Sequence, residues 1–210
     1  MSEDNSFHVT TLRDLVPEKA WVGLTSYPCF TRASDQTLLQ QGTEGSHVLA
    51  LTYGLVKVVR VDRDGRERLL AFRGPGEIVG EMALQHGGPR MADVRSMSTC
   101  KVCVIPAGDF RRLVEEHALA DRLASLASSR LLEQTEVSDG AVHERLAMAL
   151  LRLVEVSGSL SFAVTRDELA QHIGVGRGSV TKALARLGPD VVDASQKNRI
   201  TVIDKDGLKM

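Results

Sequence analysis

The chain has 210 residues and a formal net charge of -1 at pH 7, with 43% hydrophobic, 25% charged and 4% aromatic residues. This composition excludes a collagen-like chain, a disordered chain and a disulfide-stapled miniprotein, and it predicts one or two domains with real cores. The three cysteines are an odd number, which favours a reducing compartment. No apolar run approaches the roughly 20 residues of a membrane span, and the first residues are polar and acidic, so we expect a cytoplasmic protein without membrane contact.

The charge is slightly uneven along the chain. From residue 141 onward there are ten Lys and Arg residues against eight Asp and Glu residues, whereas the remainder of the chain has an acidic excess. This asymmetry weakly favours a nucleic-acid partner for the C-terminal part.

Between residues 37 and 105 the sequence predicts short antiparallel strands. Residues 56–61 and 68–72 flank an Asp-Arg-Asp-Gly turn at 62–65, which is typical of a β-hairpin. Glycine and proline breaks follow, and residues 101–105 predict one more strand. Several short strands at this spacing predict a small antiparallel barrel or roll.

After Pro106 the periodicity changes to that of helices. Asp109 is placed to cap a short helix that continues to His117, and residues 119–137 carry a narrow stripe of leucines and small residues. Such a stripe suits a symmetric dimer helix, although the same helix could instead lie on its own domain. Residues 138–140 break the pattern. We therefore expect an effector domain at 1–117, a dimerisation helix and hinge at 118–140, and a DNA-binding domain at 141–210.

The C-terminal part carries the most specific local signal. A helix is predicted from Val142 to Gly158, and Thr165 to Glu168 form a capping box that starts another. Leu169, Ala170 and Ile173 supply the buried face of that helix, and Gly174 permits a sharp turn. A second helix over residues 177–187 then completes a helix-turn-helix, for which an ordinary helical hairpin is the alternative.

The second helix of this motif presents short polar or cationic side chains that suit a DNA major groove. Residues 191–192 and 199–203 flank a polar turn and predict a two-stranded wing, whose basic residues can meet phosphates. The candidate DNA-binding residues are Thr165, Arg166, Arg177, Gly178, Ser179, Thr181, Lys182, Lys197 and Arg199.

A β-roll, a long helix and a winged helix-turn-helix in this order resemble the family of the cyclic-AMP receptor protein and the fumarate-nitrate reductase regulator (CRP/FNR). The resemblance extends from about Trp21 to Leu208 and implies an α+β fold. Its most specific piece outside the DNA-binding motif is residues 76–84, followed by Pro89 and Arg90, which look like the phosphate-binding cassette of the family. The amides at the start of a short helix at Gly80 and the guanidinium of Arg90 suit a cyclic phosphate, and Glu81 suits a ribose hydroxyl.

The resemblance implies a set of ligand-binding residues, with two departures from the family pattern. Met91 stands where cyclic-AMP-binding members have Ser or Thr, and the helix before the hinge is shorter than usual. The candidate ligand-binding residues are Gly80, Glu81, Met82, Ala83, Arg90, Met91, Gln134 and Thr135.

The DNA-reading positions also depart from the family pattern. Arg177 keeps an arginine that commonly reads guanine, whereas Gly178 replaces a frequent glutamate and Lys182 a frequent arginine. We therefore expect an operator related to, but not identical with, the best-known palindrome of the family.

These observations predict a homodimeric, sequence-specific transcription regulator that is not an enzyme. Its expected partners are palindromic double-stranded DNA, a second copy of the chain and RNA polymerase, and its expected effector is cyclic AMP or another cyclic nucleotide. The alternative is an effector-independent DNA-binding regulator with a degenerate nucleotide cassette.

Metal-dependent functions find little support in the sequence. On a strand, Cys100 and Cys103 point to opposite faces and cannot jointly hold one ion, and Cys29 stands alone. A cupin-like enzyme would need a His and Glu metal set on the strands, and the six histidines are scattered without ligand spacing. We expect no bound metal.

Overall fold

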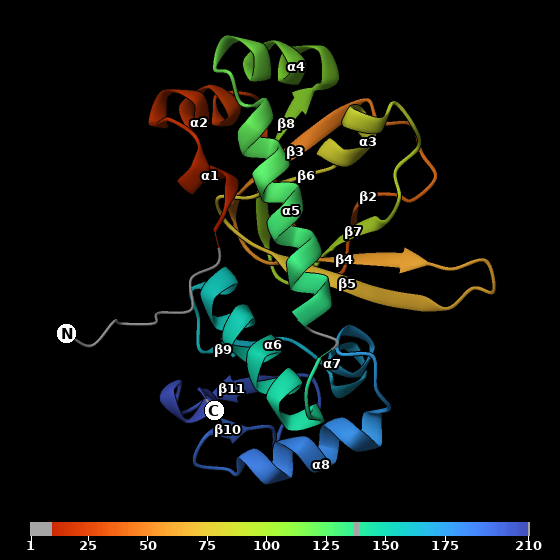
Figure 1. Ribbon diagram of the computed structural model, residues 1–210, viewed down its shortest axis with the longest axis vertical. Coiled ribbons are helices and arrows are strands. Elements are labelled where there is room, and N and C mark those ends of the chain that lie inside the picture. The colour runs from red at the N-terminus through yellow and green to blue at the C-terminus, as the bar shows by residue number, and fades with distance from the viewer. Residues whose placement is uncertain (1–9, 137–138, 210) are drawn as a thin grey trace. The chain divides into compact units, whose positions relative to one another are not determined.

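The computed structural model describes residues 10–136 and 139–209 (Figure 1). The chain divides into two compact units, one from Thr11 to Gln134 and one that contains the chain from Thr135 onward. The first unit is built on two antiparallel sheets and the second is mainly helical. Among the described residues, no helix is long and apolar enough to cross a membrane.

The first unit contains two four-stranded antiparallel sheets, with strand orders β1-β8-β3-β6 and β2-β7-β4-β5. The strands are β1 Cys29–Arg32, β2 Thr37–Leu39, β3 His47–Tyr53, β4 Val56–Val61, β5 Glu67–Arg73, β6 Ile78–Val79, β7 Asp93–Ser96 and β8 Cys100–Pro106. The predicted antiparallel roll is therefore confirmed.

The β4–β5 hairpin forms where the turn residues predict it. The amide of Asp62 donates to the carbonyl of Arg66 at 2.9 Å, and Gly65 adopts a φ of +79° that few other residues tolerate. Val59 and Leu69 face each other on the buried side of the hairpin. The residues next to Val59 and Leu69 along each strand point to the opposite side, so the hairpin has a second, more exposed face.

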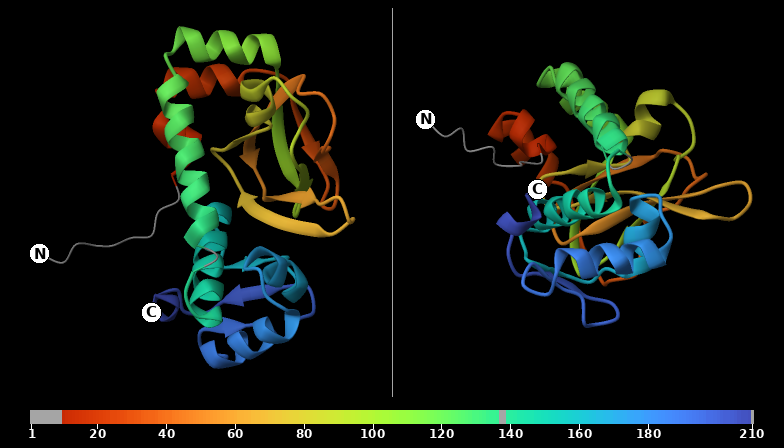
Figure 2. Two further views of the ribbon diagram at one scale, coloured as in Figure 1. Left: turned by 45° about the vertical axis from the view of Figure 1, so that its right-hand side comes forward. Right: turned by 60° about the horizontal axis from the view of Figure 1, so that its bottom comes forward.

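Helices α1 to α5 complete the first unit, which Figure 2 shows from two further sides. They are α1 Leu12–Leu15, α2 Glu18–Thr25, α3 Glu81–His86, α4 Ala107–Glu116 and α5 Ala120–Glu136. The prediction that Asp109 caps the helix is wrong: α4 begins directly after Pro106, whose φ of -57° suits that position, and Asp109 lies in the first turn. Helices α1 and α2 were not predicted, because they are short and carry little periodicity.

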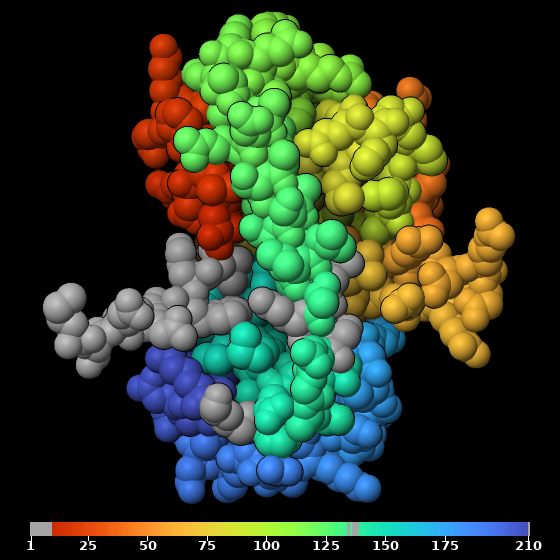
Figure 3. Space-filling view, in the orientation of Figure 1, coloured from red at the N-terminus to blue at the C-terminus, as the bar shows by residue number. Residues whose placement is uncertain are grey.

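The leucine stripe of α5 divides between two environments. Leu119, Leu123 and Leu126 are buried in the core of the first unit, whereas Leu131 and Leu132 are 67% and 63% exposed. The space-filling view shows the outer side of α5 at the surface (green, Figure 3). The first half of the stripe thus packs on its own domain, and the second half stays open.

The core of the first unit contains a disulfide between Cys29 and Cys103, so the prediction that Cys29 stands alone is wrong. The two residues face each other in the β1–β8 register but are separated by 74 residues in the sequence, and sequence spacing could not reveal that pairing. Cys100 is free and buried. No group of three or more His, Cys, Asp or Glu side chains in the described residues is placed to hold a metal ion.

The second unit carries the helix-turn-helix and a small sheet. Its elements are α6 Val142–Ser157, β9 Ser161–Phe162, α7 Arg166–His172, α8 Arg177–Leu187, β10 Val192–Asp193, β11 Ile200–Val202 and the 3-10 helix η1 Asp206–Leu208. The sheet has the order β10-β11-β9, so the predicted two-stranded wing gains a third strand. Strand β9 was not predicted, because two residues are too few for a visible alternation.

Candidate effector pocket and nucleic-acid interface

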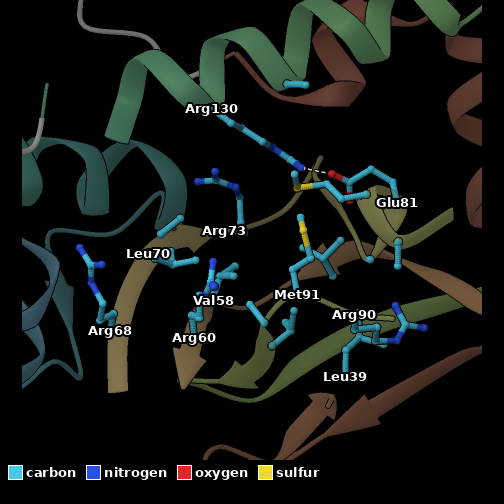
Figure 4. Close-up of a pocket in the computed structure, with 18 of the residues that line it drawn as sticks. Leu39, Val58, Arg60, Arg68, Leu70, Arg73, Glu81, Arg90, Met91 and Arg130 are labelled. Carbon is cyan, nitrogen blue, oxygen red and sulfur yellow. Dashed lines mark hydrogen bonds and ion pairs between the residues drawn. The ribbon is translucent and has the colours of Figure 1, made fainter. Parts of the chain in front are cut away.

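A pocket of about 440 Å³ lies within the first unit, between the β4–β5 hairpin, α3 and α5 (Figure 4). Six of the residues that the sequence singled out as ligand-binding line it, namely Gly80, Glu81, Met82, Ala83, Arg90 and Met91. These residues come from α3 and from the loop before β7. The fold therefore brings the two halves of the predicted cassette to one cavity.

Arg90 lies buried in the wall of this pocket, with only 4% of the residue exposed. Its Nη2 donates to the backbone carbonyl of His47 at 2.8 Å, whereas Nη1 has no hydrogen-bond partner within the described part of the chain. Burial lowers the pKa of Arg90, because desolvation disfavours the charged form. A buried guanidinium with one free donor nitrogen is a position where an anion would be stabilised.

Gly80 makes room for that guanidinium. Its φ of +91° lies in the left-handed region, and a Cβ at this position would stand 2.5 Å from Nη1 of Arg90 and 2.8 Å from Cδ1 of Leu39. A side chain here would have to displace the side chains of Arg90 and Leu39. The glycine is thus required for both the turn and the cavity.

Glu81, the predicted acceptor for a ribose hydroxyl, is already engaged. It is 6% exposed and forms an ion pair with Nη1 of Arg130, which reaches it from α5. Arg130 also donates to Glu77 at 2.7 Å and to the carbonyl of Ile78 at 2.9 Å. A ligand that uses Glu81 must share it with Arg130 or displace that arginine.

A second arginine extends this ionic network. Arg73 contacts Glu133 at 3.0 Å and Glu77 at 3.6 Å, and all three side chains are buried. Burial alone would lower the pKa of Arg130, but the charges of Glu81 and Glu77 outweigh it and raise that pKa, so the guanidinium of Arg130 keeps its charge.

The sequence reasoning missed Arg73, Glu77, Arg130 and Glu133. One signal was available for Arg130: it continues the spacing of Leu123 and Leu126 along α5, so it occupies the buried face of that helix.

The two candidate residues at the end of α5 are not part of the described pocket. Thr135 is exposed, and its contacts place it in the second unit. It is not among the described residues that line the pocket. The side chain of Gln134 lies outside the described residues. Their role toward a ligand stays a prediction.

In the second unit, the predicted capping box forms at the start of α7. The hydroxyl of Thr165 accepts from the amide of Glu168 at 3.1 Å, and the carboxylate of Glu168 accepts from the amide of Thr165 at 2.8 Å. Leu169 and Ile173 are buried, and Gly174 has a φ of +64° at the turn. The local sequence thus determines where the first helix of the motif begins and how it turns.

Helix α8 exposes the side that was expected to meet DNA. Arg177 is exposed and forms an ion pair with Asp167 at 3.2 Å, and a Cβ on Gly178 would meet no described atom within 4 Å. Thr181 and Lys182 are exposed, and Ser179 is half-buried. These side chains lie along the accessible face of one helix, as major-groove recognition requires.

The basic residues around the wing divide into two kinds. Lys197 is exposed near its tip, and Arg199 is exposed with Nη1 at 3.2 Å from the hydroxyl of Ser161. Arg166, by contrast, donates from Nη2 to the carbonyl of Ala194 at 2.6 Å and so ties α7 to the start of the wing loop.

Comparison with known proteins identifies a domain family for each unit. Residues 31–117 match the model of the cyclic nucleotide-binding domain, and residues 144–210 match that of the Crp-like helix-turn-helix domain. The cyclic AMP receptor protein of Thermus thermophilus is 29% identical over 195 residues, which cover 87% of this chain and 90% of that protein. The cAMP-activated global transcriptional regulator CRP of Salmonella typhimurium is 30% identical over 166 residues, which cover 73% of this chain and 79% of that protein.

Solved structures show the same fold. A transcriptional regulator of the CRP family from Thermus thermophilus matches with a TM-score of 0.71 at 24% identity, and the match covers 86% of this chain and 94% of that one. Together with the two matched domains and the curated relatives, this makes the chain a transcription regulator with a cyclic nucleotide-binding domain. The chain belongs to the CRP/FNR family.

Proposed function

We propose that the chain is a homodimeric, sequence-specific DNA-binding regulator whose affinity for DNA is controlled by a cyclic nucleotide in the pocket around Arg90. The observation that carries this proposal is the buried guanidinium of Arg90, whose Nη1 is unpartnered among the described residues and lies in the space that Gly80 leaves open. Leaving such a donor unpaired costs free energy, and a phosphate oxygen offsets that cost.

Within this proposal each pocket residue has a task. Arg90 binds the phosphate beside Gly80, and Glu81 accepts from the ribose hydroxyl while remaining near Arg130. Met91, which is 46% exposed, offers an apolar contact to the sugar or base in place of the hydroxyl found in relatives that bind cyclic AMP. Gln134 and Thr135 remain proposed contacts to the base.

The proposed DNA interface is the exposed side of α8 together with the wing. Arg177 reads guanine through its two parallel N–H groups, and Lys182, Lys197 and Arg199 contact phosphates. Gly178 contributes no side chain and so relaxes the specificity at one base pair. Thr165 and Arg166 act from the start of α7, where their contacts with Glu168 and with the wing loop orient the motif.

We propose that the exposed side of α5 pairs with the same helix of a second copy. Ala124, Ser128 and Leu131 are exposed and follow each other at four- and three-residue steps, so they form one narrow side of the helix. Small residues on such a side let two helices approach closely. A two-fold dimer would then place two copies of α8 about 34 Å apart on a palindromic operator, in the cytoplasm and with RNA polymerase as a further partner.

Calorimetric titration tests the effector directly. We expect saturable binding of cyclic AMP or cyclic GMP to the intact protein, and a loss of about 30-fold or more in affinity for Arg90→Gln, because a charge-assisted pair with the phosphate is removed. Arg66→Gln is the control, since Arg66 is an exposed arginine in the turn of the β4–β5 hairpin and does not line the pocket. Failure of cyclic AMP, cyclic GMP and cyclic di-GMP alike to bind the intact protein would contradict the proposal.

One specific observation favours the alternative, an effector-independent regulator. The ion pair of Glu81 with Arg130 already satisfies the carboxylate that a ribose would use, and Met91 brings no hydroxyl to the phosphate. This alternative predicts the same affinity for operator DNA with and without nucleotide, and no change in Arg90→Gln. Fluorescence anisotropy with labelled operator distinguishes the two.

A further inference from the structure

The β4–β5 hairpin presents a pair of arginines to the same pocket. Arg60 and Arg68 are directly opposite each other in the strand register, and both line the cavity. Val58 and Leu70, two positions further along each strand, line it as well, as alternation along a strand requires. Figure 4 shows both arginine side chains on the side of the strands that carries these apolar residues.

An arginine pair at this position is unfavourable without a counter-charge. Residues directly opposite in an antiparallel pair have Cβ atoms about 5 Å apart, and like charges there repel each other. Within the described residues, the one ion pair found for Arg60 is with Asp62 at 3.7 Å, and the two side chains are 57% and 35% exposed. For Arg68 no hydrogen bond or ion pair is found within the described residues. Glu67, its neighbour in the chain, pairs with Arg95 instead.

The arginines of the pocket therefore form two groups. Arg73 and Arg130 are neutralised by the buried carboxylates of the ionic network. Arg60, Arg68 and Arg90 have no buried carboxylate among the described residues. A cyclic mononucleotide carries one negative charge, and when that charge is bound to Arg90 the ligand supplies no second anion to Arg60 and Arg68.

Much of the remaining lining of the cavity is apolar. Val58, Leu70 and Met91 line the cavity along with Arg90 and the arginine pair. A cavity that combines apolar lining with two positions for anions suits a nucleoside that carries phosphate at two separate places, with its base or sugar against the apolar residues.

We propose that the preferred ligand of this pocket is a nucleotide with two separate phosphate groups, one bound by Arg90 and the other by Arg60 and Arg68. This inference rests on the proposed function, since it assigns a ligand class to the same pocket. Cyclic dinucleotides and nucleosides with pyrophosphate groups at two positions share this chemistry. A bidentate contact from each arginine supplies the second anion site.

Calorimetric titration with four compounds tests the proposal: cyclic AMP and cyclic GMP with one phosphate, and cyclic di-GMP and guanosine tetraphosphate with two phosphate positions. We expect one of the latter two to bind about tenfold more tightly than either mononucleotide. We also expect R60Q/R68Q to weaken that ligand about tenfold and to change the affinity for the mononucleotides less than about threefold. Whichever compound binds identifies the arrangement of the two phosphates.

R63Q/R66Q is the matched control, because it removes the same charge from the turn of the same hairpin, away from the cavity lining. It should leave every affinity unchanged. Equal binding of all compounds, or an equal effect of the two double variants, would overturn the proposal even if binding depends on Arg90. Binding of cyclic AMP or cyclic GMP that is lost in Arg90→Gln, without any preference for two phosphates, would leave the proposed function standing. If none of the four compounds binds, both proposals fail.

Discussion

The pocket and the helix-turn-helix are built on opposite principles. In the pocket, side chains from β5, the loop before β6, α3 and α5 meet in a buried ionic network, and partners such as Arg130 and Glu81 lie 49 residues apart in the sequence. In the helix-turn-helix, contacts such as that of Thr165 with Glu168 join near neighbours, and Arg177 and Lys182 stay exposed. In a buried site the same residues serve ligand binding and stability, so a substitution changes both. In an exposed site the side chains can be substituted without disturbing the fold.

The largest expected effect is on the buried network. Arg73→Met removes one partner of Glu77 and one of Glu133, and breaking a buried ion pair by removing one member costs about 3 to 5 kcal/mol. Urea unfolding followed by circular dichroism measures the loss of unfolding free energy. Arg177→Met in the exposed site should cost no more than about 0.5 kcal/mol. Equal losses of unfolding free energy at the two positions would contradict the contrast between the buried and the exposed site.

The next effect concerns the disulfide of the first unit. Cys29 and Cys103 close a loop of 74 residues in sequence separation, and a cross-link of this length stabilises by about 2 to 4 kcal/mol. Adding reductant should therefore lower the unfolding midpoint of the natural chain. C29A/C103A should show no response to reductant. An unchanged midpoint in the natural chain would show that the cross-link contributes nothing.

At the DNA interface the expected effect is smaller and specific. Arg177→Ala should cost about 1 to 3 kcal/mol of binding and blur the preference at one base position, because its bidentate contact is lost. Selection of binding sites from random DNA measures the base preference, and fluorescence anisotropy measures the affinity. An equal loss of affinity for specific and for random DNA would show that Arg177 does not read a base.

Lys197→Ala should act differently from Arg177→Ala. A phosphate contact at the wing tip carries no sequence information, so its removal should lower the affinity for all DNA sequences by the same factor. It should also reduce the slope of log affinity against log salt concentration by about one, because one counterion fewer is released on binding. A change in sequence preference would indicate that the wing reads bases.

The smallest effect is a pH dependence next to Arg90. Burial and the charge of Arg90 lower the pKa of His47, so between that lowered value and about 6.5 the unfolded chain binds more protons than the folded chain. The stability should be independent of this group above about pH 6.5 and should fall as the pH drops below it. The stability of His47→Gln, measured by urea unfolding over the same pH series, should fall less. If the natural chain and His47→Gln showed the same dependence of unfolding free energy on pH, His47 would not contribute to that dependence.

The two regions also differ in how much the sequence could predict. The capping box at Thr165, the turn at Gly174 and the ends of α8 depend on neighbours in the chain, and all three are confirmed. The cassette from Gly80 to Arg90 was recognised by its local motif. The ion pairs of Arg130 and the disulfide of Cys29 depend on which strand or helix lies opposite, and a single sequence does not contain that information.

The most direct test of the central claim is the affinity for operator DNA with and without nucleotide, measured by anisotropy on the natural chain and on Arg90→Gln. We predict that a bound nucleotide tightens DNA binding by about tenfold or more in the natural chain and has no effect in Arg90→Gln, which keeps the affinity of the nucleotide-free protein. The same affinity in all four conditions would contradict the claim that the Arg90 pocket controls the helix-turn-helix.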